Sequence, residues 1–219
     1  MILWYNRNGL LQRTHTWIRE GNWLLVLLFI LFAIVLAKIK KYNVLCIFKT
    51  FDIYPLFAVE LIYLFFQINV FFDNYSYVQY ASQIQMAYIL VLVVPILRRR
   101  LYLQAVWGSG LVFIGSILNR IVIAANGGKM PVLPTLSRLT HYYRDNALLQ
   151  GIDDFHILMT DSTQLNILGD YIDIGFSIMS IGDLCIHAFV TIIVFYTIKS
   201  INQEAGICKK WKGKHYGLL

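Results

Sequence analysis

Five long apolar stretches, separated by connections that differ sharply in their Lys and Arg content, constrain this chain more than any other feature. The stretches cover residues 23–37, 54–72, 78–97, 101–124 and 174–198. A helix needs about 20 apolar residues to cross a bilayer, and lysine side chains that reach the interface can extend the short first stretch. Hydrophobic residues make up 58% of the chain and charged residues 14%, which excludes an ordinary soluble domain. We therefore predict an all-α polytopic membrane helix bundle with about five transmembrane helices.

The basic residues indicate how the predicted spans are oriented. Most of the 19 Lys and Arg residues lie in three segments, residues 38–49, 98–100 and 199–214. Cytoplasmic loops are enriched in Lys and Arg, so we expect these segments in the cytoplasm. The long segment 126–173 carries three basic residues against six aspartates and is expected outside. The N-terminus is then outside and the C-terminus inside.

The chain divides into three predicted parts. Residues 1–22 mix arginines with Leu and Trp, as expected of an interfacial segment, and they lack the pattern of a cleavable signal peptide. Residues 23–198 form the five-span bundle, and residues 199–219 form a basic cytoplasmic tail. Within the bundle, residues 126–173 are too long for an ordinary connection and are expected to form a structured extracytoplasmic cap. The cap opens at Asn126 with Gly127 and Gly128, where positive backbone dihedrals and a sharp turn are expected.

The net charge of +7 requires no nucleic-acid partner, because most of it is the orientation signal and a basic tail that suits lipid headgroups. The predicted partner is the lipid bilayer. The three cysteines lie on the cytoplasmic side or within the last span, so we expect no disulfide. The chain contains no CxxC, HExxH, P-loop, GxSxG or GxGxxG motif, and we expect no cofactor.

Polar residues inside the predicted spans are costly and usually face the bundle interior. On the last span, Ser177, Ser180, Asp183 and His187 recur at three- and four-residue steps and are predicted to form one stripe. Glu60 lies in the inner third of the second span, where it is expected to be neutral or to face the Lys-rich interface.

The fourth span carries Asn119 and Arg120 near its outer end, above small residues that allow a neighbouring helix to approach. Arg120 and Asp183 differ in predicted depth by about 7 Å, which a flexible arginine can bridge. We therefore predict an Arg120–Asp183 ion pair, with a structural or a functional role. The alternative is that Arg120 reaches outward, and that Ser180, Asn119 or backbone amides of the cap hold Asp183.

Three strings resemble the signature of a bacterial integral membrane family known as domain of unknown function 5317. They are ANGGKMPV at residues 125–132, a His followed by a TxLxxLGD pattern at residues 156–170, and SIGD at residues 180–183. The resemblance covers about residues 23–201 and implies a multispan fold in a bacterial cytoplasmic membrane, without an activity. The extra leader, the basic tail and Arg120 depart from the family pattern. The motif positions are Asn119, Asn126, Gly127, Gly128, Met130, Pro131, His156, Leu168, Gly169, Asp170, Ser180, Gly182 and Asp183.

These polar residues are expected to converge on one outward-facing pocket beneath the cap. For His156 alone, a surface or capping role competes with a ligand contact. A metal site built from His156, Asp170, Asp183 and His187 is disfavoured, because no zinc-site spacing occurs in the cap. The candidate ligand- or partner-binding residues are Asn119, Arg120, Asn126, Gly127, Gly128, Met130, His156, Asp170, Ser180, Asp183 and His187.

Three classes of function remain open. The leading hypothesis is a non-enzymatic membrane component whose capped pocket binds a small molecule, a peptide or a partner subunit, which can be another copy of the chain. The second is a transporter or transporter subunit that uses Glu60, Asp183 and His187 as a relay. The third is an intramembrane enzyme, which is disfavoured because Cys185 and His187 face different directions on one helix.

Overall fold

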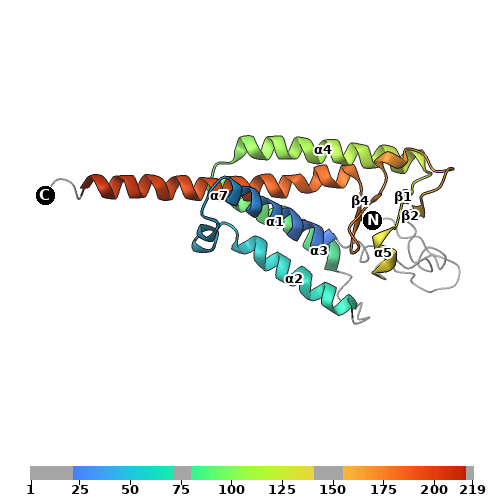
Figure 1. Ribbon diagram of the computed structural model, residues 1–219, viewed down its shortest axis with the longest axis horizontal. Coiled ribbons are helices and arrows are strands. Elements are labelled where there is room, and N and C mark those ends of the chain that lie inside the picture. Colours follow the sequence, from blue (N-terminus) through green and yellow to red (C-terminus); the bar gives the residue numbers. More distant parts are fainter. Residues whose placement is uncertain (1–21, 72–79, 141–154, 216–219) are drawn as a thin grey trace.

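The computed structural model describes residues 22–71, 80–140 and 155–215 (Figure 1). The chain is mostly helical, as predicted. Its long helices are α1 (Asn22–Ile39), α2 (Tyr54–Phe71), α3 (Ala81–Arg98), α4 (Tyr102–Ala125) and α7 (Ile181–His215), with a short 3₁₀ helix, η2 (Val44–Lys49), between α1 and α2. The predicted interfacial segment, residues 1–22, lies outside the described residues except for its last position.

The segment between α4 and α7 contains short strands, which the all-α prediction did not include. Its elements are β1 (Met130–Val132), α5 (Leu136–Leu139), β2 (His156–Leu158), η4 (Asn166–Leu168), β3 (Ile172–Asp173) and β4 (Ile178–Met179). Strand β1 pairs with β2 in parallel, and on its other side Val132 forms a parallel bridge with Asp170. We refer to residues 126–180 as the α4–α7 segment.

Two helices are long and apolar enough to cross a membrane among the described residues, Tyr102–Ala125 and Ile181–Ala205. The apolar helices Leu25–Ile39 and Tyr54–Phe66 are shorter. The helix that begins at Ile181 continues beyond the predicted end of the last span, through residues 199–215, and projects from the bundle (Figure 1).

The last helix begins seven residues later than predicted. Residues 172–179 instead form a hairpin, in which Ile172 pairs with Met179 and the amide of Ile174 donates to the carbonyl of Ser177. Gly175 has a φ of +87°, a conformation that favours glycine, and turn-forming residues therefore interrupt the apolar pattern here. Ser177 lies in this hairpin and not on the helix, so the predicted stripe is wrong at that position.

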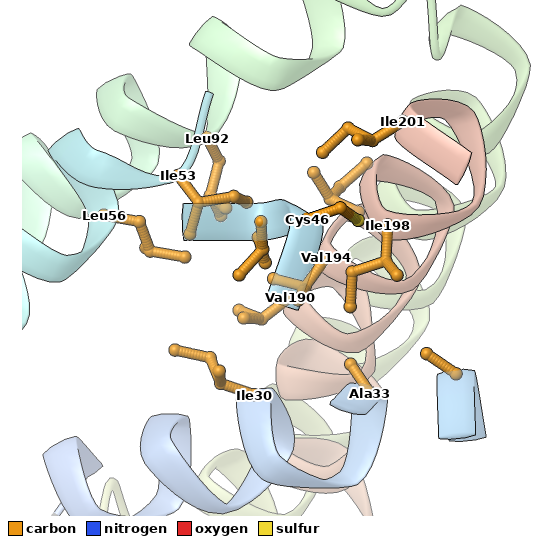
Figure 2. Packing of buried hydrophobic residues seen from close by; sticks show 13 residues of the cluster. Ile30, Ala33, Cys46, Ile53, Leu56, Leu92, Val190, Val194, Ile198 and Ile201 are labelled. Atoms are coloured by element: carbon orange, nitrogen blue, oxygen red, sulfur yellow. The ribbon is translucent and has the colours of Figure 1, made fainter. Parts of the chain in front are cut away.

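Helix α7 is the centre of the bundle and lies between α4 and α1 (Figure 1). Its buried side chains include Val190, Val194 and Ile198, which pack with residues of α1, η2 and α3 (Figure 2). The hydroxyl of Thr191 donates to the carbonyl oxygen of Phe29 at 3.0 Å and adds a polar tie between α7 and α1. The same helix therefore holds both sides of the bundle together.

Glycines allow α4 and α7 to approach closely, as predicted for the small residues of the fourth span. A Cβ atom on Gly115 would lie 2.3 Å from the carbonyl oxygen of Gly182. A Cβ atom on Gly108 would lie 2.3 Å from the Phe189 ring. The two backbones can therefore pack at this distance only because these positions lack side chains.

Candidate functional site

The SIGD string, residues 180–183, begins α7 and forms a reciprocal cap with its own backbone. The hydroxyl of Ser180 accepts a hydrogen bond from the Asp183 amide at 3.0 Å, and the Asp183 carboxylate accepts one from the Ser180 amide at 3.0 Å. This is the capping-box arrangement, in which two backbone donors at the helix start are satisfied by side chains. The helix dipole also favours the negative charge of Asp183 in the first turn.

Asn119 joins this cap to α4. Its amide nitrogen donates to the Asp183 carboxylate at 2.8 Å, and its amide oxygen accepts from the Ser180 hydroxyl at 2.9 Å. Asn119 also contacts the backbone at Gly182, where a Cβ atom would lie 1.9 Å from the Asn119 side-chain oxygen. The predicted residues Asn119, Ser180 and Asp183 therefore form one compact hydrogen-bonded group.

The predicted ion pair between Arg120 and Asp183 is wrong. One Asp183 carboxylate oxygen accepts a hydrogen bond from Asn119 and the other accepts one from the Ser180 amide. Within the described residues no ion pair or hydrogen bond links the carboxylate to Arg120. Arg120 is exposed. The predicted depth of Asp183 assumed a helix that begins at residue 174, whereas Asp183 lies in the first turn of α7. The alternative expected from the sequence, in which Ser180 and Asn119 hold Asp183, is the one observed.

His187 lies one turn further along α7. Its Nδ1 atom is 2.8 Å from the carbonyl oxygen of Asp183, which suits a donor nitrogen at that position. Its ring stacks on Phe29 of α1, with the ring centroids 5.4 Å apart. His187 therefore packs α1 against α7, one turn after the capping residues Ser180 and Asp183.

His156 and Asp170 lie on opposite sides of β1. The His156 Nε2 atom is 3.5 Å from an Asp170 carboxylate oxygen, and both side chains are largely buried. Asp170 also bonds to β1 through its backbone, since its amide donates to the Pro131 carbonyl at 2.9 Å and its carbonyl accepts from the Leu133 amide at 2.8 Å. The pair therefore links the two chain segments that flank β1.

Asn126 ties the start of the α4–α7 segment to a distant loop. Its side-chain oxygen accepts from the Gln164 amide at 2.8 Å, and its side-chain nitrogen donates to the Gln164 carbonyl at 2.9 Å. Gly127 and Gly128 follow with φ values of +65° and +89°, which confirms the predicted turn. Met130 is buried in β1.

The predicted site residues therefore form separate groups. Asn119, Ser180, Asp183 and His187 lie at the start of α7, whereas His156 and Asp170 flank β1. Within the described ranges, no three His, Cys, Asp or Glu side chains lie close enough to hold a metal ion.

Asp173 has a structural role that the sequence reasoning missed. Its carboxylate accepts hydrogen bonds from the amides of Thr135 and Ser137 at 2.6 and 2.9 Å, and from the Gly175 amide at 2.8 Å. Burial alone would raise the pKa of this carboxyl, but the hydrogen bonds from Ser137, Gly175 and Thr135 outweigh burial and lower the pKa. A helix start with unsatisfied amides after Pro134 was the available signal.

An ion-pair network at the α3–α4 end of the bundle was also missed. The buried Asp52 carboxylate is 3.0 Å from Arg98 Nε and accepts a hydrogen bond from Arg99 Nε at 2.9 Å. Arg99 also pairs with Glu204 of α7. Burial lowers the pKa of Arg99, but hydrogen bonds to Asp52 and Glu204 more than compensate and raise the pKa. Asp52 is the one acidic residue in the Lys-rich stretch 38–53, which was the signal for a buried partner of the arginines.

Cys46 belongs to a neighbouring cluster at the same end. The side-chain oxygen of Asn202 accepts a hydrogen bond from the Asn43 amide at 2.8 Å, and the side-chain nitrogen of Asn202 donates one to the Asn43 carbonyl at 3.1 Å. The Cys46 thiol donates to the same carbonyl at 2.7 Å, and burial raises the pKa of this thiol. This cluster fastens η2 to α7.

The fold and the site define a mostly helical protein with two helices that are long and apolar enough to span a membrane. The chain matches the family described as "Family of unknown function (DUF5317)" over residues 18–195, and it belongs to that family, as the three motifs implied.

A curated relative in Thermotoga maritima is described as an uncharacterized protein. It is 29% identical over 119 residues, a match that covers 49% of this chain and 64% of that protein. The chain thus matches less than two thirds of the length of this relative. No solved structure matches the chain.

Proposed function

We propose that α1, α2, α3, α4 and α7 are five spans of a bacterial cytoplasmic membrane protein. The α4–α7 segment lies outside, the N-terminus is outside and the C-terminus is in the cytoplasm. Support comes from the exposed apolar surface of α4, which includes Val106, Trp107 and Phe113 at 68–70% exposure and would face lipid. Support also comes from the basic residues at the α3–α4 end. The division into an interfacial N-terminal segment, a bundle with its cap (residues 126–173) and a basic tail is part of this proposal.

The function that the geometry supports best is that of a non-enzymatic membrane component whose cap binds a partner subunit. One observation carries this proposal: the residues of the three motifs fasten the cap to the helix ends, while apolar side chains of the cap stay exposed. Ile167 is 71% exposed and Leu165 is 43% exposed, in a loop that Asn126 ties to α4. Rigid presentation of apolar side chains reduces the entropic cost of binding.

The partner is proposed to be a membrane protein, because the apolar surface of the cap continues that of α4. Element η4 packs against α4, and Ile121 and Ile117 of α4 are also exposed near its outer part. Lipid tails can cover the side chains of α4, but beyond the hydrocarbon region Ile167 would face water. A partner that spans the membrane and extends past its surface can cover both.

Photo-crosslinking in native membranes tests this proposal. A photoreactive phenylalanine analogue at position 167 should yield one discrete protein adduct, and the same analogue at Phe113 in mid-span serves as the lipid-facing control. The Asn126→Ala substitution, which releases the loop, should reduce that adduct. An adduct of twice the chain mass would identify the partner as a second copy. Lipid adducts alone at both positions would rule out a docked partner.

The contacts favour this function over a transport relay or an enzyme. The hydrogen bonds of Asp183 and His187 stay within the start of α7 and Asn119, whereas Glu60 bonds to Tyr88. Cys185 packs beside Gly115, so Cys185 and His187 do not form a nucleophile and base pair. Transport remains the second candidate, and its one favourable observation is the buried carboxyl of Glu60 inside α2.

A further inference from the structure

Glu60 is a buried acidic residue inside α2. Its exposure is 5%, and its neighbours in the sequence are apolar. It lies six residues beyond the start of α2, which corresponds to about 9 Å along the helix. In the proposed membrane orientation, this places the carboxyl in the cytoplasmic half of the hydrocarbon region.

One side chain contacts the carboxyl. The hydroxyl of Tyr88, on the neighbouring helix α3, donates a hydrogen bond to Glu60 Oε1. The second oxygen, Oε2, is fully buried and has no hydrogen-bond partner among the described residues. The carboxyl is therefore half satisfied, in a place where each unmet polar group is costly.

No positive charge offsets Glu60 within the described part of the chain. On the elements that pack against α2, Arg98 and Arg99 at the end of α3 bind Asp52, and Lys38 at the end of α1 is exposed. On α2 itself, the titratable residue one turn away is Tyr63, which carries no positive charge. An ionised carboxylate at this depth would need a cation beside it, because burial of an unpaired charge is strongly unfavourable.

The small number of polar groups near Glu60 Oε2 limits which ligand it can bind. Mg²⁺ and Ca²⁺ bind six or more oxygen ligands, whereas the described neighbours of Glu60 offer the carboxyl and one hydroxyl. A proton needs a single oxygen. We propose that Glu60 and Tyr88 form a proton-binding site within the bundle, in which Oε2 takes up a proton from water and returns it, while Tyr88 holds Oε1.

The proton transfer balances without another reactant, since the carboxylate and a hydronium ion become a carboxylic acid and water. Tyr88 keeps its own proton and serves as a positioning residue. The inference rests on the proposed membrane arrangement but is independent of a partner at the cap. Failure to find a crosslinked partner at position 167 would therefore leave the inference about Glu60 intact.

Infrared spectroscopy of the full chain in lipid nanodiscs tests the site. We expect the wild-type spectrum to contain the C=O stretch of a buried protonated carboxyl, and this band should disappear in Glu60→Gln. Tyr88→Phe should shift the band, because it removes the hydrogen bond to Oε1. The control is Glu204→Gln, which changes an acid that is 65% exposed and should leave the band in place.

A second measurement needs no variant. A hydrophobic carbodiimide reacts with protonated carboxyls in apolar surroundings, and it should modify Glu60 in the wild-type chain, as read by peptide mass, less strongly as the pH rises. Absence of both modification and the protonated-carboxyl band at every pH would mean that Glu60 is always ionised, and it would overturn the proposal. A band that persists unchanged in Glu60→Gln would overturn it too.

Discussion

At the scale of single residues, the motif side chains act mainly on backbone groups. Asp183 and Ser180 cap the start of α7, and Asn119 of α4 hydrogen-bonds to their side chains and so joins α4 to α7. Asn126 likewise bonds to the backbone of Gln164. Each of these side chains satisfies backbone donors or acceptors at a helix start or in a loop, where regular secondary structure supplies no partner.

The first prediction concerns the coupling between Asn119 and Asp183. Asn119→Ala or Asp183→Ala alone should cost about 1 kcal/mol or more of unfolding free energy, since each breaks the group that caps α7. The double substitution should cost less than the sum, with a coupling of about 0.5–3 kcal/mol. Thermal unfolding in detergent measures all four proteins.

Arg120→Ala provides the matched control, because Arg120 is the exposed neighbour of Asn119 on the same helix. Its effect should stay within about 0.5 kcal/mol, and it should show no coupling to Asp183→Ala. Strong coupling between Arg120 and Asp183, or simple additivity for Asn119 and Asp183, would contradict the hydrogen-bonded group described above.

The second prediction compares two glycines. Gly182→Ala should destabilise the fold by about 1–3 kcal/mol, because the new Cβ would lie 1.9 Å from Asn119 and 2.7 Å from the Gly115 carbonyl oxygen. Gly110→Ala on α4 should be neutral or stabilising, since nothing lies within 4 Å of its Cβ position and alanine favours helix. Equal losses of melting temperature would argue against the close crossing of α4 and α7.

At the scale of elements, short connections fasten the long helices. Asp173 in β3 caps α5 across 36 residues of sequence through Ser137. At the other end of the bundle, Arg99 joins the connection before α2 to α7 through Asp52 and Glu204. Both contacts fix the direction in which a chain segment enters or leaves the bundle.

The third prediction is a pH dependence that arises from Asp173. Hydrogen bonds lower its pKa below the ordinary value of 3.8, so its contribution to stability is fully present above that value. The contribution is lost as the pH falls through the lower pKa of the folded state. The melting temperatures of wild type and Asp173→Asn should therefore differ near neutral pH and converge in acid. A difference that stays constant across this range would exclude an ionised cap at Asp173.

At the scale of the whole molecule, membrane topology can be tested by cysteine labelling. The Ser137 side chain is buried, so it is a poor labelling position. Exposed Ser162 in the α4–α7 segment is suitable, together with Gly213 near the end of α7. In a background without native cysteines, single cysteines at these positions should react with an impermeant reagent from opposite faces of intact membranes. Reaction of both from the same face would contradict the five-span topology.

The sequence by itself determined the long helices and their order, because hydrophobic runs and turn residues act over a few neighbouring positions. It placed α2 and α4 within one or two residues of their observed bounds. It also predicted the positive dihedrals of Gly127 and Gly128, because adjacent glycines carry that information locally.

The apolar pattern alone did not indicate the residue at which α7 begins. Ile174, Phe176 and Ile178 continue the hydrophobic run of the last span, yet Asp173 and Gly175 turn the chain into a hairpin there. Since the true start at Ile181 brings Asp183 into the first turn, its partners became Ser180 and Asn119 instead of Arg120.

Only the tertiary structure decided which distant groups meet. The pairs Glu60 with Tyr88, Asp52 with Arg99 and Asn126 with Gln164 each join segments whose relative placement depends on how the helices pack. Hydropathy and charge counts report whether a residue prefers water or lipid, but a hydrogen bond requires two atoms within about 3 Å. That precision arises from packing of the whole bundle around α7, which no local pattern in the sequence encodes.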